Sequence, residues 1–375
     1  MVRSLPLFVA AFLTDLALYL IFAAIPFRAL ELGAGPLGLG SLPTLYAGSY
    51  MLMAALGGRL SDRFSRIGLA RTGCCLFVAG AVGLASVRTL PLLYLVTPAL
   101  GVALGLFWSP VQAALSDRFT PGRLPRAMAA FNMAWSLGKG LGLVIGGTVV
   151  DLAAPRTVFL IAAAPVVVTA LVLPRRAAAG DGVEGAHDAT EPIPMRRVRL
   201  AWITNALAFG LVGTVNMHAP RFLLDLGGNA SDFGLLLGLV FAVQTLTFAG
   251  LARHRPDRWA APLALGCGLL AMLVFLTAPG PGWRLAAAIP FGLATGIAYD
   301  ASLHASLHRP SGRGRAAGLH EMVLGGGSSS LPLAAGLASR ATGSLAAPFH
   351  LAMLVLAAGC LLALREAVRE RSRAA

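Results

Sequence analysis

Residues 5–26 read LPLFVAAFLTDLALYLIFAAIP, an apolar run that Asp15 and Tyr19 interrupt. A run of about 20 apolar residues is long enough to cross the hydrocarbon core of a bilayer as a helix. Arg3 precedes the run, as a basic residue does in a secretory signal peptide. The polar interruptions and a later repeat of the same region favour a helix that remains in the mature protein.

The composition of the whole chain leads to the same class of protein. Of 375 residues, 57% are hydrophobic and 12% are charged, whereas soluble domains are near a quarter charged. This chain therefore has too few charged residues to cover a water-facing surface. The composition excludes a secreted domain, a disulfide scaffold and a soluble enzyme. We expect no enzymatic activity, no cofactor and no resident metal.

Further apolar runs of similar length follow the first, so we predict an all-helical membrane protein with twelve transmembrane helices. The predicted spans are residues 5–26, 41–58, 68–87, 91–115, 127–150, 157–173, 200–220, 233–252, 260–278, 285–307, 316–338 and 348–364.

Arginine is distributed unequally between the two ends of these spans. Six arginines, one in each odd-numbered loop, lie on one side, and the other twenty-three lie on the side of the two termini. This positive-inside asymmetry predicts that both termini are cytoplasmic, and we expect a bacterial inner membrane. The net charge of +14 is therefore a topology signal, and we expect no nucleic-acid partner.

The chain also repeats itself at a nearly constant offset. PFRALELG at residues 26–33 returns as PRFLLDLG at 220–227, and GVALGLFW at 101–108 returns as GLATGIAY at 292–299. We predict two six-helix bundles, 1–174 and 200–366, joined by a cytoplasmic linker, 175–199, and followed by a cytoplasmic tail, 367–375. Such a duplication is typical of secondary transporters, whose halves move against each other about a site at the membrane midplane.

The most specific motif, GGRLSDRFSR at residues 57–66, lies between the second and third spans. It resembles the loop signature of the major facilitator superfamily, Gly-x-Leu-Ala/Ser-Asp-Arg/Lys-x-Gly-Arg, with Ser65 in place of the second glycine. The resemblance covers the twelve-span plan and implies a monomeric secondary transporter. It also implies that Asp62 holds the halves in the outward-facing state, with Gly58, Arg63 and Arg66 completing this latch. An ordinary solvated turn is the alternative.

A glycine pattern in the fifth span resembles the antiporter signature of the same family, Gly-x3-Gly-Pro-x2-Gly-Gly. Its members are Gly138, Gly142, Gly146 and Gly147, and Leu143 stands where the signature has proline. Pro332 occupies the equivalent place in the eleventh span. The resemblance implies export, and small residues allow close packing between the halves. Helix packing without any bearing on direction is the alternative.

Charged residues inside the spans are informative because a charge in a bilayer is costly unless it is paired or hydrated. Asp15 and Lys139, the only lysine of the chain, fall at comparable depth in the first and fifth spans. Substrate binding or proton coupling is one interpretation of these residues, and a structural ion pair is the other.

A second group of polar residues lies in the tenth and eleventh spans. Asp300 and Glu321 fall in nearly the same layer, and His304 follows Asp300 by one helical turn. We expect this layer to carry protons, because histidine titrates near neutrality. A satisfied polar contact is the alternative, and a metal-ion site has no ligand set of fixed spacing to support it.

Softer candidates for a substrate cavity are aromatic and amide side chains, for which core packing is the alternative. They are Trp108, Gln112, Asn132, Trp135 and Tyr299.

We therefore expect proton-coupled export of a small amphipathic molecule across the bilayer by alternating access. Uptake or facilitated passage of a sugar, an organic acid or a metal ion by the same fold is the first alternative. A membrane sensor that does not transport is a further one.

Overall fold

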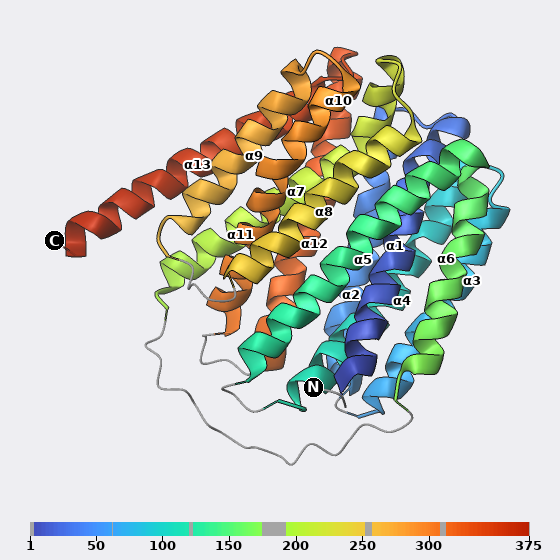
Figure 1. Cartoon of the computed structure of the whole chain (residues 1–375), viewed down its shortest axis with the longest axis horizontal. Coiled ribbons are helices and arrows are strands. Elements are labelled where there is room, and N and C mark those ends of the chain that lie inside the picture. Colours follow the sequence, from blue (N-terminus) through green and yellow to red (C-terminus); the bar gives the residue numbers. More distant parts are fainter. Residues whose placement is uncertain are drawn as a thin grey trace.

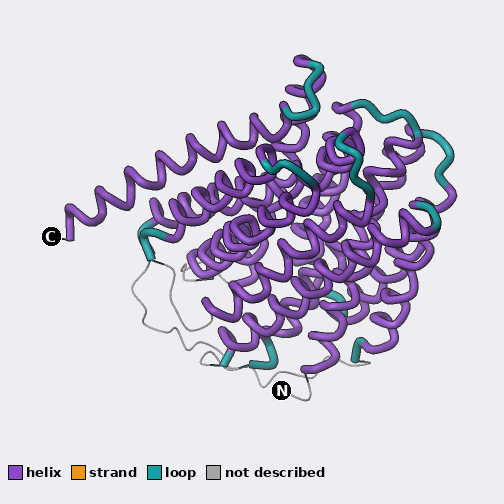
Figure 2. Tube along the Cα trace, turned by 45° about the horizontal axis from the view of Figure 1, so that its top comes forward, coloured by secondary structure: helices purple, strands orange, loops and turns teal. Residues whose placement is uncertain are grey.

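The computed structural model describes residues 4–61, 63–119, 123–174, 193–251, 257–307 and 313–374, and these contain helices and no strand, as predicted (Figure 2). Twelve of the helices are at least 18 residues long. The first half contains α1 (Leu5–Glu31), α2 (Pro36–Ser61), α3 (Arg66–Ser86), α4 (Leu90–Ser116), α5 (Leu124–Leu152) and α6 (Pro155–Val172). The second half contains α7 (Met195–Asp225), α8 (Ala230–Leu251), α9 (Ala260–Thr277), α11 (Ala288–Leu307), α12 (Arg313–Thr342) and α13 (Ala347–Ala374). A short helix, α10 (Pro281–Arg284), and a 3-10 turn, η2 (Leu285–Ala287), precede α11.

The long helices run alternately up and down between two faces of the molecule (Figure 1). We call the face that holds Ser4, Pro174 and Ile193 the near face. The opposite one, which holds Leu32 and Leu226, is the far face. The described chain begins at the near-face end of α1 and finishes at the near-face end of α13.

Each predicted span lies inside one long helix and overruns its end by at most one residue, except that η2 and α11 share the tenth. Most of the helices are longer than the predicted spans, and two of them extend furthest at the near face. The helix α7 begins inside the predicted linker, 175–199, and α13 continues into the predicted tail, 367–375, as far as Ala374. Ion pairs of Arg196 with Glu366 and of Arg197 with Glu370 join the two extensions. Helical turns rich in charged residues thus extend these two helices beyond the ends predicted from hydrophobicity.

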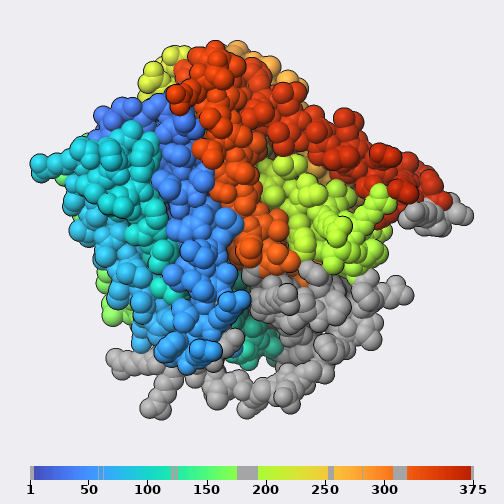
Figure 3. Space-filling model, turned by 180° about the vertical axis from the view of Figure 1, so that it is seen from behind, coloured from blue at the N-terminus to red at the C-terminus, as the bar shows by residue number. Residues whose placement is uncertain are grey.

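The same set of helix contacts occurs in each half. In the first half, α5 and α6 pack on α1, and α4 packs on α2 and α3. In the second half, α12 and α13 pack on α7, and α11 packs on α8 and α9. The halves meet mainly where α5 packs on α8 and where α2 packs on α12, and Figure 3 shows α2 (blue) beside α12 (orange-red). The repeated contacts match the internal repeat of the sequence.

Nine of the described helices are long and apolar enough to cross a membrane. The other three long helices, α2, α11 and α12, carry more glycine, serine and other polar residues. Two of them, α2 and α12, pack on each other at the junction of the halves. Polar residues cost less where a helix faces protein than where it faces lipid.

The glycine pattern of α5 serves two interfaces rather than one. A Cβ on Gly138, Gly142 or Gly146 would overlap with α1, whereas one on Gly147 would overlap with the start of α8. Three of the four glycines therefore pack α5 within its own half, and only Gly147 allows the close approach between the halves that we expected of the pattern.

Candidate binding cavity between the halves

A cavity lies between the two halves, with about 1120 Å³ of empty space when the part open to solvent is included. Most of its wall is apolar or aromatic. The charged residues of the wall are Asp15, Lys139 and Glu321, and the aromatic ones are Tyr19, Phe22, Tyr46, Tyr50, Trp108, Trp135, Phe209 and Tyr299. Both halves contribute to the cavity, which is the arrangement that a site accessible to each side in turn requires.

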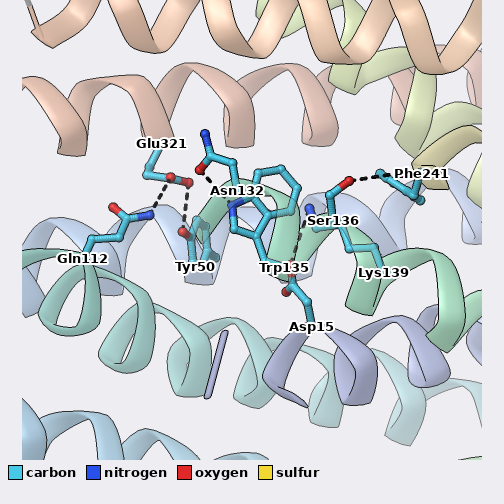
Figure 4. Close-up of polar contacts among 9 residues, drawn as sticks. All are labelled: Asp15, Tyr50, Gln112, Asn132, Trp135, Ser136, Lys139, Phe241 and Glu321. Atoms are coloured by element: carbon cyan, nitrogen blue, oxygen red, sulfur yellow. Dashed lines mark hydrogen bonds and ion pairs between the residues drawn. The ribbon is translucent and has the colours of Figure 1, made fainter. Parts of the chain in front are cut away.

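The first charged group of the cavity is an ion pair within the first half. Lys139 Nζ lies 3.8 Å from Asp15 Oδ2, and the two side chains are 12% and 4% exposed (Figure 4). The two residues are brought together because α5 packs along α1 on its glycines. Each charge is thus at least partly compensated by the other.

Four aromatic rings surround the ammonium group of Lys139. Its Nζ lies 4.3 Å from the ring centre of Trp135, 4.8 Å from Tyr19, 5.5 Å from Phe241 and 5.8 Å from Phe209. A cation within about 6 Å of a ring face is attracted by the ring quadrupole. Two of these rings, Phe209 and Phe241, belong to the second half, so the environment of Lys139 depends on how the halves are placed.

Glu321 of α12 forms the second charged group, and it bridges the halves. Its carboxylate accepts a hydrogen bond from Tyr50 Oη at 3.0 Å and another from Gln112 Nε2 at 3.3 Å (Figure 4). Both donors belong to the first half, on α2 and α4. Glu321 therefore contacts the opposite half directly, whereas Asp15 and Lys139 bond within one half.

The predicted layer of Asp300, His304 and Glu321 is not assembled around the cavity. Asp300 and His304 lie on α11 without lining it, while Glu321 points to the other half. The residue that α11 does contribute is Tyr299, whose ring packs on Trp135 at 5.1 Å. Within the described part of the chain, no group of three or more His, Cys, Asp and Glu side chains is placed to hold a metal ion.

The softer candidates are mostly on the cavity wall. Trp108, Gln112, Trp135 and Tyr299 line it. Asn132 does not, but its Oδ1 accepts a hydrogen bond from Trp135 Nε1 at 3.1 Å. Asn132 thus positions the indole ring that covers Lys139.

The predicted latch is only partly described, because Asp62 lies outside the described residues. Gly58 lies within α2, and Arg63 is exposed at the near face. Arg66 forms an ion pair with Asp117 at the end of α4. Ser65, which departs from the family signature, accepts a hydrogen bond from the amide of Gly68 at 3.2 Å and so caps α3.

Three tyrosines of the cavity, Tyr19, Tyr46 and Tyr50, were not predicted, although the sequence carries a signal for them. The chain has only five tyrosines, and four of them, Tyr19, Tyr46, Tyr50 and Tyr299, line the cavity. Rarity marked the single lysine as informative, and the same reasoning applies to tyrosine. Tyr46 and Tyr50 are also one helical turn apart, which places them on one face of α2.

Comparison with known proteins places the fold and the family. Residues 7–309 match the family model of the Major Facilitator Superfamily. Protein spinster homolog 1 of Bos taurus is 27% identical over 287 residues, which cover 66% of this chain and 53% of that relative. The chain thus matches about half the length of this curated relative.

Solved structures with the same fold cover nearly the whole chain. One is a bacterial homolog to the human lysosomal transporter Spinster in an inward-facing and occupied conformation, with a TM-score of 0.72 and 14% identity over 97% of this chain and 94% of that one. The inward-facing and unoccupied conformation gives a TM-score of 0.71 with the same identity and coverage. The family match, the twelve long helices and the cavity between two repeated halves agree, and the chain belongs to the Major Facilitator Superfamily.

Proposed function

We propose that this membrane transporter exports a small amphipathic molecule in exchange for protons, by alternating access to the cavity between its halves. The observation that carries the proposal is the cavity itself, in which an aromatic wall surrounds three charged side chains. Aromatic walls bind the apolar part of a ligand, and a few fixed charges orient its polar part. A purely hydrophilic substrate would leave most of this wall unused.

Protons are proposed to bind at the carboxylates of the cavity, with Glu321 as the principal site and Asp15 as the second. Glu321 accepts both of its cross-half hydrogen bonds as a carboxylate. Protonation converts one of its oxygens into a donor and weakens the bonds that it accepts. Proton binding at Glu321 therefore changes a contact between the halves, which is what coupling to alternating access requires. Asp300, which does not line the cavity, is no longer proposed as a carrier.

The orientation is proposed from the arginine distribution, which assigns the near face to the cytoplasm of a bacterial-type inner membrane. The near-face position of the first and last helix ends supports cytoplasmic termini. Export is proposed from the resemblance of the α5 glycines to the antiporter signature. Function as a monomer is proposed from the family resemblance alone.

The proposal is tested by proton movement into proteoliposomes that hold the purified protein and a pH-sensitive dye. Cationic dyes, sugars, organic acids and divalent metals are added one at a time to the wild type, Glu321→Gln and the matched carboxylate variant Asp300→Asn. We expect a flux that depends on an amphipathic compound, persists in Asp300→Asn and disappears in Glu321→Gln. Flux that persists in Glu321→Gln contradicts the assignment of Glu321, and substrate exchange without proton flux identifies a facilitator.

A further inference from the structure

Asp151, in the last turn of α5 at the far face, bonds to the first turn of α8 in the other half. Its Oδ1 accepts a hydrogen bond from the amide of Ala230 at 3.0 Å. Its Oδ2 accepts bonds from the amide of Ser231 at 2.7 Å and from Ser231 Oγ at 2.5 Å. One carboxylate therefore makes three bonds across the junction of the halves.

These bonds complete the cap of α8. The first amides of a helix have no partner within the helix, and they carry its positive end. Two of them are satisfied locally, because Asn229 and Asp232 each accept a bond from the other's amide, at 2.9 and 3.0 Å. The two amides between them, those of Ala230 and Ser231, donate to Asp151. The start of α8 is therefore fully capped only while the two halves are together at this face.

The surrounding contacts place the carboxylate at a point where the halves must separate if the far face opens. Gly147, one turn before Asp151, lies against the main chain of Ala230. Nearby, the rings of Phe27 and Phe233 meet across the halves with centres 5.8 Å apart. Neither helix can move away from the other here without breaking the bonds of Asp151.

We propose that Asp151 is a positioning residue of the transport cycle, which holds the far face closed by capping α8 from the opposite half. The inference rests on alternating access as proposed above, and it assigns a residue that neither the loop signature nor the glycine pattern contains. The internal repeat makes this contact one-sided. The shift of 189 residues that relates α5 to α12 places Arg340 at the position of Asp151, and a cation does not cap a helix N-terminus.

The test measures how often the cavity opens to the far side. A cysteine is introduced at Met217, a buried residue of the cavity wall, after the four native cysteines are replaced by alanine. An impermeant maleimide is added on the far side, and its reaction rate reports the fraction of molecules open there. A cysteine in place of Arg88, exposed at the far face between α3 and α4, identifies that side.

We expect Asp151→Ala to raise the labelling rate about fivefold, the effect of removing a typical helix cap. Asp151→Asn keeps one acceptor oxygen but loses the charge, so it should raise the rate less. Asp232→Ala is the matched control for Asp151→Ala, since it removes a cap of the same helix that does not cross between the halves, and it should leave the rate unchanged. Ser231→Ala, which removes only the hydroxyl bond, should give a smaller rise and covers the case in which the Asp151 variants fail to fold.

An unchanged rate in folded Asp151 variants overturns the proposal, and so does an equal rise in Asp232→Ala. The measurement needs neither substrate nor a proton gradient. A rise without any proton-coupled flux would therefore preserve the role of Asp151 and reject the proposed coupling.

Discussion

The two interfaces between the halves use different chemistry at the far face. Where α2 meets α12, main chain approaches main chain, since a Cβ on Gly40 would overlap the carbonyl group of Pro332. Where α5 meets α8, glycines also allow a close approach, and in addition the carboxylate of Asp151 accepts hydrogen bonds from the first amides of α8. Deeper in the molecule the charged contact belongs to the α2–α12 interface instead, where Tyr50 of α2 donates a hydrogen bond to Glu321 of α12.

Under the proposed function, the charged group of each interface has a separate task, and close packing contributes to closure of the far face. The α2–α12 interface places the ionisable group of Glu321 inside the cavity, where its protonation changes hydrogen bonds between the halves. The α5–α8 interface places a charge at the far face, where it acts on closure and not on substrate. Close packing can therefore be perturbed at the α2–α12 interface, and charge at the α5–α8 interface, independently of each other.

The largest effect is expected from adding volume to the α2–α12 interface. Gly40→Leu would force α2 away from the main chain of α12, and overpacking of this kind costs about 1–3 kcal/mol. We expect far-side labelling of the Met217 cysteine to rise on the order of tenfold or more, with transport reduced accordingly. Gly48→Leu is the matched control on the same helix, since no atom lies within 4 Å of a Cβ built there. Equal effects at the two glycines would contradict the role of close packing.

A smaller effect is expected from removing one hydrogen bond inside the cavity. Tyr50→Phe keeps the ring and deletes the donor to Glu321, and a bond to a charged group contributes about 1.5–3 kcal/mol. We expect proton-coupled flux to fall about tenfold while far-side labelling changes little. Tyr94→Phe is the control, because Tyr94 lies on α4 outside the cavity wall. Flux that is unaffected by Tyr50→Phe would separate Glu321 from the coupling step.

The fold could be predicted almost entirely because it depends on runs of apolar residues. Membrane length and the internal repeat located the twelve long helices, and the comparison of Asp15 and Lys139 by depth anticipated their contact. Depth along a helix says nothing about which way a side chain points. Asp300 and Glu321 are predicted at the same depth, yet only Glu321 lines the cavity, because orientation around the helix axis is set by packing.

The contacts of Asp151 show a second limit of prediction from sequence. An aspartate at the end of an apolar span is an ordinary loop residue by composition. Its partners are the main-chain amides of Ala230 and Ser231. Every residue except proline carries such an amide, so the residue types do not identify these partners. Polar contacts that join a side chain to the backbone of a distant helix become visible only when the tertiary arrangement is known.

The smallest effect is expected from salt, and it distinguishes the two interfaces without altering any packing. Asp151 is exposed, so its attraction to the start of α8 is screened as the Debye length falls from about 10 Å at 0.1 M to about 3 Å at 1 M. We expect far-side labelling of the Met217 cysteine to rise about twofold over this range of sodium chloride in the wild type, since screening weakens an exposed charge–helix interaction without abolishing it. In Asp151→Asn the rate should start higher and no longer respond to salt. In Gly40→Leu it should start higher and still respond, because the charged contact at α5–α8 is intact. An identical salt response in the wild type and in Asp151→Asn would mean that the reagent or the bilayer, and not this carboxylate, is the source of the salt dependence.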